Sequence, residues 1–100
     1  MNWEVVEEEL PYHHCVVSDA GAKYYYDERE YYHRLDGPAF ETRVLKVWYE
    51  HGKRHRLDGP AVEGRGGYVE YWISGIQISP ELFPHVRGWE IELRARRARA

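Results

Sequence analysis

Two short stretches of the chain, residues 44–49 and 68–73, alternate their side chains with a period of two and are rich in β-branched and aromatic residues. This period places alternate side chains on opposite faces of a sheet, so each stretch is predicted to be a β-strand. The inward set is expected to comprise Leu45, Val47, Tyr49, Val69, Tyr71 and Ile73. The opposite face is then expected to carry Lys46, Trp48, Glu50, Tyr68, Glu70 and Trp72.

Glycine-containing segments next to these strands predict tight turns. His51-Gly52 and Ser74-Gly75 follow the two strands, and Gly64–Gly67 precedes the second one. Glycine reaches positive φ without strain, as turns between antiparallel strands require. The chain is therefore predicted to run as successive β-hairpins, with Gly64–Gly67 as a hairpin turn rather than a phosphate-binding loop.

An internal repeat is the most specific signal in the sequence. The heptad at 33–39 recurs without change at 55–61, an offset of 22, and the strands at 44–49 and 68–73 align with an offset of 24. Residues 19–26 form a weaker earlier copy, and Trp3–Val6 form a still weaker start. Such periodicity is typical of arrays in which each unit packs only on its neighbours.

The heptad is predicted to be a structural bend at a strand end. Its bracing and turn residues are His33, Arg34, Asp36, Gly37, Pro38 and their copies His55, Arg56, Asp58, Gly59 and Pro60. The Asp side chain can accept bonds from amides just downstream, Gly adds conformational freedom, and Pro withholds a ladder donor. Leu35 and Leu57 are expected in the core. Ala39 and Ala61 are expected where backbones pack closely.

The C-terminal part of the chain changes from strand to helix patterning. Ser79-Pro80-Glu81 is typical of a helix start. An apolar stripe is predicted at Leu82, Phe83, Val86 and Trp89. Pro84 and Gly88 favour a short or interrupted helix. Residues 89–100 are predicted to form either a second helix or a frayed tail. A helix here would cap the open end of the sheet.

The predicted fold class is mainly β: a meandering antiparallel sheet built of repeated β-hairpins, with a short C-terminal helix as cap. One hundred residues suit a single domain, 1–100. Its repeat-like units span approximately 20–41, 42–63 and 64–78, followed by a helical and basic segment at 79–100.

The heptad, with Trp-Tyr and a Gly turn before its second copy, resembles the MORN-like repeats of bacterial and bacteriophage proteins over about residues 20–78. The resemblance implies stacked hairpins and scaffold or binding roles more often than catalysis. It also implies a phage- or bacterium-encoded binder or inhibitor of a host protein. The chain lacks regular Tyr-x-Gly-x-x-x-x-Gly units, so the lipid binding ascribed to ordinary MORN repeats is not carried over.

Charge and cysteine content bear on the surface of the protein and on its cellular location. The net charge is −3, with an acidic edge at Glu7–Glu9 and a basic tail formed by Arg94, Arg96, Arg97 and Arg99. Both are interpreted as solvated surface; contact of the tail with nucleic acid or an acidic partner is the alternative. With one cysteine, no opening leader and no long apolar run, a cytoplasmic location is expected.

Candidate chemistry is sparse. His33 with Asp36 and His55 with Asp58 could serve a metal or acid–base site, but their duplication at the repeat spacing favours bracing of a turn. In a strand, His13 and His14 point to opposite faces, and Cys15 resembles a buried strand residue. No catalytic residue, metal or cofactor is predicted.

The aromatic residues are the stronger functional clue. Nine Tyr and four Trp stand against two Phe, and exposed Tyr and Trp patches are typical of interfaces. The predicted partner-binding residues are Tyr25, Tyr32, Trp48, Tyr68 and Trp72. Whether the C-terminal segment covers them stays open. The hypothesis is a non-enzymatic module that binds another protein. The alternatives are a self-assembling homodimer formed through edge strands and, less favoured, nucleic-acid binding; no membrane contact is expected.

Overall fold

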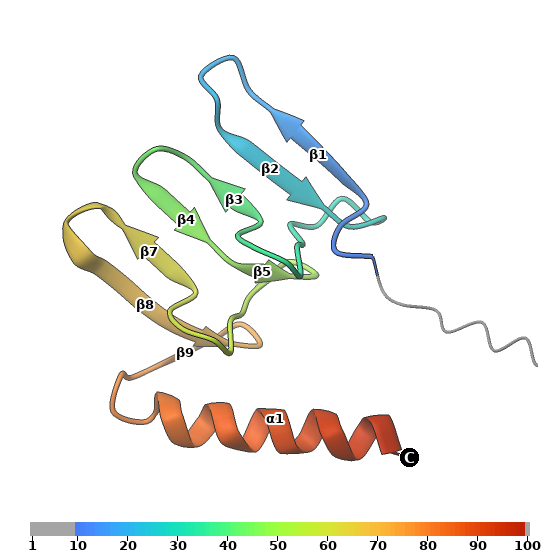
Figure 1. Cartoon of the computed structure of the whole chain (residues 1–100), viewed down its shortest axis with the longest axis vertical. Coiled ribbons are helices and arrows are strands. Elements are labelled where there is room, and N and C mark those ends of the chain that lie inside the picture. The colour runs from blue at the N-terminus through green and yellow to red at the C-terminus, as the bar shows by residue number, and fades with distance from the viewer. Residues whose placement is uncertain (1–9, 100) are drawn as a thin grey trace, which may run out of the picture.

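A computed structural model describes residues 10–99, and the sheet of hairpins expected from the alternating pattern is present (Figure 1). Seven antiparallel strands follow the order β1-β2-β3-β4-β7-β8-β9. Their bounds are β1 His14–Val17, β2 Lys23–Tyr26, β3 Phe40–Glu41, β4 Leu45–Val47, β7 Val62–Gly64, β8 Tyr68–Ile73 and β9 Ile76–Ile78. A two-stranded sheet pairs β5 (Tyr49–Glu50) with β6 (Lys53–Arg54). The early start at Trp3–Val6 and the acidic edge at Glu7–Glu9 lie outside the described residues.

The two repeat units match through their backbone hydrogen bonds. The N–H of Ala39 donates to the carbonyl of Val47, and the N–H of Ala61 donates to that of Glu70. Val47 therefore corresponds to Glu70, an offset of 23 rather than the predicted 24. The extra residue lies in the second hairpin tip, where the short helical turn Arg65–Gly67 joins β7 to β8 with positive φ at Gly66 and Gly67.

This register corrects the predicted faces of the strands. Leu45 pairs with Gly64, which in turn pairs with Tyr68, so Leu45 lies on the same face as Tyr68. Val47 is likewise on the face of Glu70 through Val62. The predicted inward set therefore mixes the two faces, because a shift of one residue moves every side chain of a strand to the other side.

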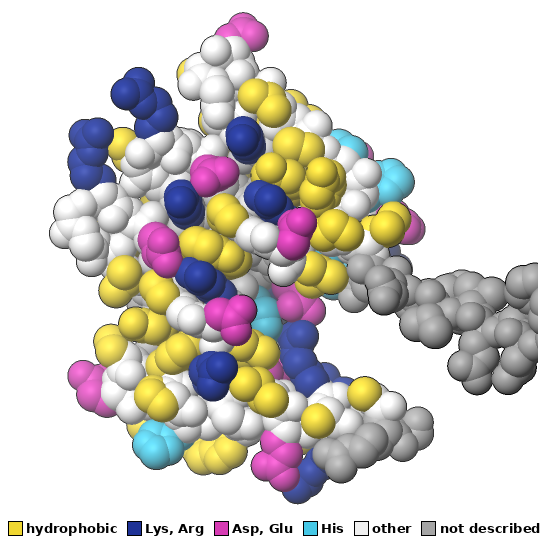
Figure 2. Space-filling view, in the orientation of Figure 1, with side chains coloured by type: hydrophobic (Ala, Val, Ile, Leu, Met, Phe, Trp, Pro, Cys, Tyr) yellow, Lys and Arg dark blue, Asp and Glu magenta, His cyan; other side chains and the backbone are white. Residues whose placement is uncertain are grey.

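A row of alternating charges crosses the opposite face. Lys23, Glu41, Lys46 and Glu63 are directly paired from strand to strand. Figure 2 shows basic and acidic side chains alternating across the hairpins, with hydrophobic side chains between them. Opposite charges at directly opposed positions support antiparallel pairing without burying apolar surface.

Each heptad histidine holds the turn of the following unit. The N–H of His51 donates to Nδ1 of His33, and the N–H of Ser74 donates to Nδ1 of His55, both at 2.9 Å. His51-Gly52 and Ser74-Gly75 all have positive φ, the conformation of a two-residue hairpin turn. Both histidines are buried, with 2% of His33 and 8% of His55 exposed. We call each His-to-turn bond a clasp.

Each heptad arginine covers an aromatic ring of the preceding strand. The guanidinium carbon of Arg34 lies 4.1 Å from the Tyr25 ring centre, and that of Arg56 lies 3.9 Å from the Trp48 ring centre. Each arginine also donates through Nη1 to the carbonyl of the heptad proline, at 3.3 and 3.1 Å. The guanidinium therefore covers the ring over which an apolar side chain would otherwise pack.

The core is thin and lies between the units. Ala39 and Ala61 are fully buried, as predicted from their size, and Val47 and Val62 pack across the sheet beside them. Leu35, predicted as core, is 44% exposed, Leu57 is half-buried, and it is Arg34 that covers the buried Tyr25 ring. The chain does bend at 35–37 and 57–59 as expected. Asp36, however, accepts a 2.7 Å hydrogen bond from Nε of Arg34.

The C-terminal helix α1 (Phe83–Arg99) is one continuous helix of 17 residues, longer than predicted. Pro84 is tolerated because it lies in the first turn, where its missing N–H would have no helical partner. The predicted stripe is wrong in one respect: Phe83 is buried against Tyr71, with ring centres 4.5 Å apart, whereas Leu82 and Trp89 are exposed. Figure 1 shows α1 beyond the last hairpin, covering the end of the sheet and neither face.

Among residues 10–99, no helix is both long and apolar enough to cross a membrane.

Candidate binding face

One face of the sheet carries a continuous row of rings, which we call the aromatic face. It comprises His14, Tyr24, Tyr26, Tyr32, Phe40, Tyr49, Tyr68 and Trp72. Ring centres along the row are 5.0 Å apart for His14–Tyr26, 5.3 Å for Tyr26–Tyr32 and 5.2 Å for Tyr32–Tyr49. Neighbouring repeat units supply successive rings, so the repeat itself builds the row.

Arg54 continues the row to Trp72. Its Nε donates to the Tyr49 hydroxyl at 3.5 Å, and its guanidinium carbon lies 5.0 Å from the Trp72 ring centre. At the β8 end of the row, Glu70 accepts hydrogen bonds from the Tyr68 hydroxyl and from Nε1 of Trp72. These bonds lower the pKa of the Glu70 carboxyl and hold it as a carboxylate.

The aromatic face is open within the described part of the chain. Most of its rings are half-buried, and Tyr68 is 55% exposed. Because α1 lies at the end of the sheet, it does not cover the row (Figure 1). Rings that are partly buried against one another and partly in solvent are held rigidly, so little side-chain entropy remains to be lost when a partner binds.

The predicted binding residues divide between the two faces. Tyr32, Tyr68 and Trp72 belong to the aromatic face. Tyr25 is 8% exposed on the opposite face beneath Arg34, and Trp48 is covered by Arg56.

The prediction missed five members of the row: His14, Tyr24, Tyr26, Phe40 and Tyr49. The offset of 23 between His51-Gly52 and Ser74-Gly75 could have placed Tyr49 on the face of Trp72, whereas the other four depend on strand pairing.

The ring geometry limits what the face can bind. The His14–Tyr26 and Tyr26–Tyr32 rings are nearly parallel, with interplanar angles of 21° and 23°. Their flat sides therefore cover one another, and edges and hydroxyl groups remain for a ligand. Nucleobases bind by stacking on a free ring side, so these rings do not offer the usual platform for single-stranded nucleic acid.

The histidines pack into the framework. The His33 and His51 rings stack at 3.9 Å, and Nδ1 of His51 lies 2.9 Å from Oδ2 of Asp27. Burial opposes ionisation of Asp27, but the bonds from His51 and from two backbone amides outweigh it and lower the pKa of the carboxyl. Among residues 10–99, no group of three His, Cys, Asp or Glu residues is placed to hold a metal ion.

The His13–His14–Cys15 segment is spread over the sheet edge. His14 lies against Tyr26 and 3.7 Å from the Glu30 carboxylate. Cys15 is exposed, so the expectation of a buried strand cysteine was wrong. The cause is that β1 is an edge strand, and among residues 10–99 no second layer covers it.

His55 joins the sheet to α1. Its Nε2 lies 3.2 Å from Nη2 of Arg94 and 3.4 Å from the Glu50 carboxylate, which Arg94 also contacts at 3.3 Å. Burial lowers the pKa of His55, and the Arg94 charge adds to this against the opposing effect of Glu50. Because Nδ1 accepts the turn amide, the proton of neutral His55 lies on Nε2, which faces the Glu50 carboxylate; Arg94 then binds Glu50 rather than the imidazole.

Two arginines of the basic tail, Arg94 and Arg96, are paired with local carboxylates. Arg94 contacts Glu50 and Glu90, and Arg96 pairs with Glu92 at 2.6 Å. These arginines are therefore partly occupied within the molecule, which weakens the case for a nucleic-acid-binding tail.

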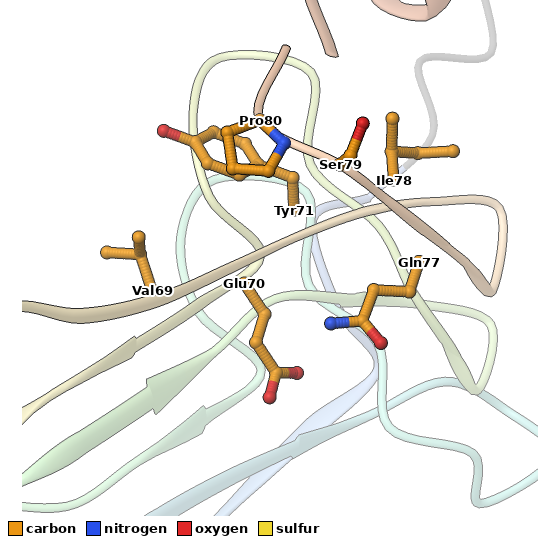
Figure 3. A pocket seen from close by; sticks show the side chains of 7 residues that line it. All are labelled: Val69, Glu70, Tyr71, Gln77, Ile78, Ser79 and Pro80. Carbon is orange, nitrogen blue, oxygen red and sulfur yellow. The ribbon is translucent and has the colours of Figure 1, made fainter. Parts of the chain in front are cut away.

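A hollow of about 370 Å³ lies beside β8 and the link from β9 to α1. Figure 3 shows Tyr71 and Pro80 close together on one side of the strands, while Glu70 and Gln77 point to the other. The lining comes from both sides of the sheet margin, so the polar groups do not converge on a common point as they do in most small-molecule sites.

No protein-family model, curated protein or solved structure matches the chain. The resemblance to MORN-like repeats stays a prediction that rests on the heptad.

Proposed function

We propose that this protein is a non-enzymatic binding module whose aromatic face binds another protein. The observation that carries the proposal is the continuous row of half-buried rings from His14 to Trp72, which α1 does not cover. Tyr, Trp and Arg are enriched where protein interfaces hold most of their binding energy. A host protein, bound or inhibited, is the partner class that the repeat resemblance implies.

A protein suits this face better than a nucleic acid for two reasons. The row carries one arginine, Arg54, and one carboxylate, Glu70, so it lacks the excess positive charge that binds phosphates. The stacked rings also present edges and hydroxyls, which suit hydrogen bonding to a polypeptide.

Two neighbouring residues on β8 provide a matched test. Tyr68 is 55% and Val69 is 45% exposed, and they lie on opposite faces. We expect Tyr68→Glu to weaken binding of a partner captured by the wild type by about tenfold or more. Val69→Glu should leave it unchanged. Affinity capture from host extract, followed by calorimetric titration of the purified partner, measures both. Equal effects of the two variants would refute the assignment of the face.

A photo-crosslinking residue tests the centre of the row. Placed at Tyr49, it should couple to the captured protein, whereas at Lys46, on the charged face, it should not. Crosslinking from Lys46 alone would place the interface on the other side of the sheet.

A further inference from the structure

Within the described part of the chain, helix α1 presents an exposed apolar stripe on the side that does not contact the sheet. The stripe comprises Leu82, Val86, Trp89 and Leu93. Leu82 is 57%, Trp89 65% and Leu93 45% exposed, and Val86 is half-buried. Leu82 precedes the helix, but its carbonyl accepts from the N–H of Val86 at 3.0 Å and so continues the spiral. Spacings of four, three and four residues place the stripe on one side of a helix.

A different side of the helix packs against the sheet. Phe83 packs on Tyr71, Arg87 donates to the Leu57 carbonyl, and Arg94 contacts Glu50. The docked residues are largely polar, and the exposed ones are large and apolar. This reverses the usual arrangement of a surface helix, whose apolar stripe faces the core.

We propose that the stripe pairs with the same stripe of a second copy, the two α1 helices running antiparallel across a two-fold axis. The spacing of four, three and four reads the same in both directions. An antiparallel copy therefore places Leu82 against Leu93 and the small Val86 against the large Trp89, filling each layer evenly. Parallel pairing would set Trp89 against Trp89 and Val86 against Val86, overfilling one layer and underfilling the other.

Complementary polar side chains beside the stripe, a hydrogen-bond donor and a carboxylate, support the same pairing. His85 and Glu92 each precede a stripe residue by one position, so they flank the stripe on the same side. In the antiparallel pair, His85 of each copy lies beside Glu92 of the other, and the two-fold axis makes this contact twice. The stripe lies on α1 and the aromatic face lies on the strands, so dimerisation leaves the proposed binding face free and the two proposals can fail separately.

The oligomeric state of the full chain tests the proposal. Sedimentation equilibrium over about a hundredfold range of concentration should show a reversible dimer, and Trp89→Glu should raise its dissociation constant by about tenfold or more. Ile91→Glu is the matched control: Ile91 is 40% exposed on the same helix but lies off the stripe, so the dimer should persist. A wild-type protein that stays monomeric throughout, or equal loss with both variants, would overturn the proposal.

A charge exchange tests the antiparallel direction. His85→Glu places two carboxylates side by side and should weaken the dimer. Adding Glu92→Lys should restore it, because each new glutamate then faces a lysine of the other copy. Failure of the double variant to recover would overturn the antiparallel arrangement. Circular dichroism of each variant confirms that α1 remains helical.

Discussion

The two heptads contain the same glycine in different surroundings, and this predicts opposite effects of one substitution. Neither Gly37 nor Gly59 has a left-handed φ, so alanine is compatible with both backbones. A Cβ at Gly37 would lie 2.8 Å from the guanidinium carbon of Arg34, closer than van der Waals contact. At Gly59 the distance to the corresponding atom of Arg56 is 3.4 Å, an ordinary contact.

Gly37→Ala must therefore displace the Arg34 guanidinium. The displacement weakens its contact with the Tyr25 ring, about 0.5–1 kcal/mol, and its bond to the Pro38 carbonyl, about 0.5–1.5 kcal/mol. The exposed ion pair with Asp36 adds little. In the opposite direction, alanine restricts the unfolded chain, which raises the free energy of unfolding by about 0.4–1 kcal/mol. The net result is a destabilisation of about 1 kcal/mol, within a range of roughly 0–2 kcal/mol. Gly59→Ala displaces no side chain and only restricts the unfolded chain. It should therefore stabilise the folded protein by about 0.4–1 kcal/mol.

Thermal unfolding followed by circular dichroism measures the difference. Two variants that differ by about 1–2 kcal/mol should differ in Tm by roughly 5–10 °C in a chain of this length, with the alanine at 59 more stable. Urea titration supplies the free energies independently. If both substitutions shift Tm equally, or if Gly59→Ala is the worse, then the close approach of Arg34 is not what requires glycine in the first heptad.

Three further predictions concern the clasps and the helix. Gly52→Ala and Gly75→Ala should each cost about 1 kcal/mol or more, measured by urea unfolding, because their φ values of +83° and +81° strain any side chain. Burial lowers the pKa of His55 below its ordinary 6.5, so the unfolded chain takes up the proton first. Stability should then fall as the pH drops from about 6.5 through the lower folded pKa, a slope in Tm that His55→Asn should reduce. Arg94→Met should speed amide exchange in the last turns of α1 without affecting the first hairpin, because it removes the contact with Glu50.

The hairpin repeat and the turns were predictable because they depend on local chemistry. An unchanged heptad, glycines at positive φ and alternating strands each point to the same element, and the structure contains all of them. The faces were not predictable in the same way. Aligning Trp48 with Trp72 is natural, yet hydrogen bonding matches Trp48 with Tyr71 and Tyr49 with Trp72. A single residue inserted in a hairpin tip is invisible to composition but reverses both faces.

The heptad illustrates a second limit of sequence reasoning. Its glycine was expected to supply conformational freedom. At Gly37, however, glycine is needed because a Cβ would lie too close to the Arg34 guanidinium. Leu35 was expected in the core by its type alone, but it is exposed, and Arg34 covers the Tyr25 ring. The position of Arg34 is set by its contact with Tyr25 on another strand, which a local pattern does not contain. The length of α1 was underestimated because Pro84 falls in the first turn, where proline is harmless.

The two units differ in length at only one margin of the sheet. The step from the heptad histidine to the clasped amide is 18 residues in the first unit and 19 in the second, and the added residue lies at the hairpin tip. The clasp side is tied by buried histidines, whereas the tip side ends in exposed turns such as Arg65–Gly67. Affinity tags, fluorophore sites or extra loops should therefore be accepted between Gly66 and Gly67. The same insertions beside His51 would break the clasp between His33 and the turn and separate the repeat units.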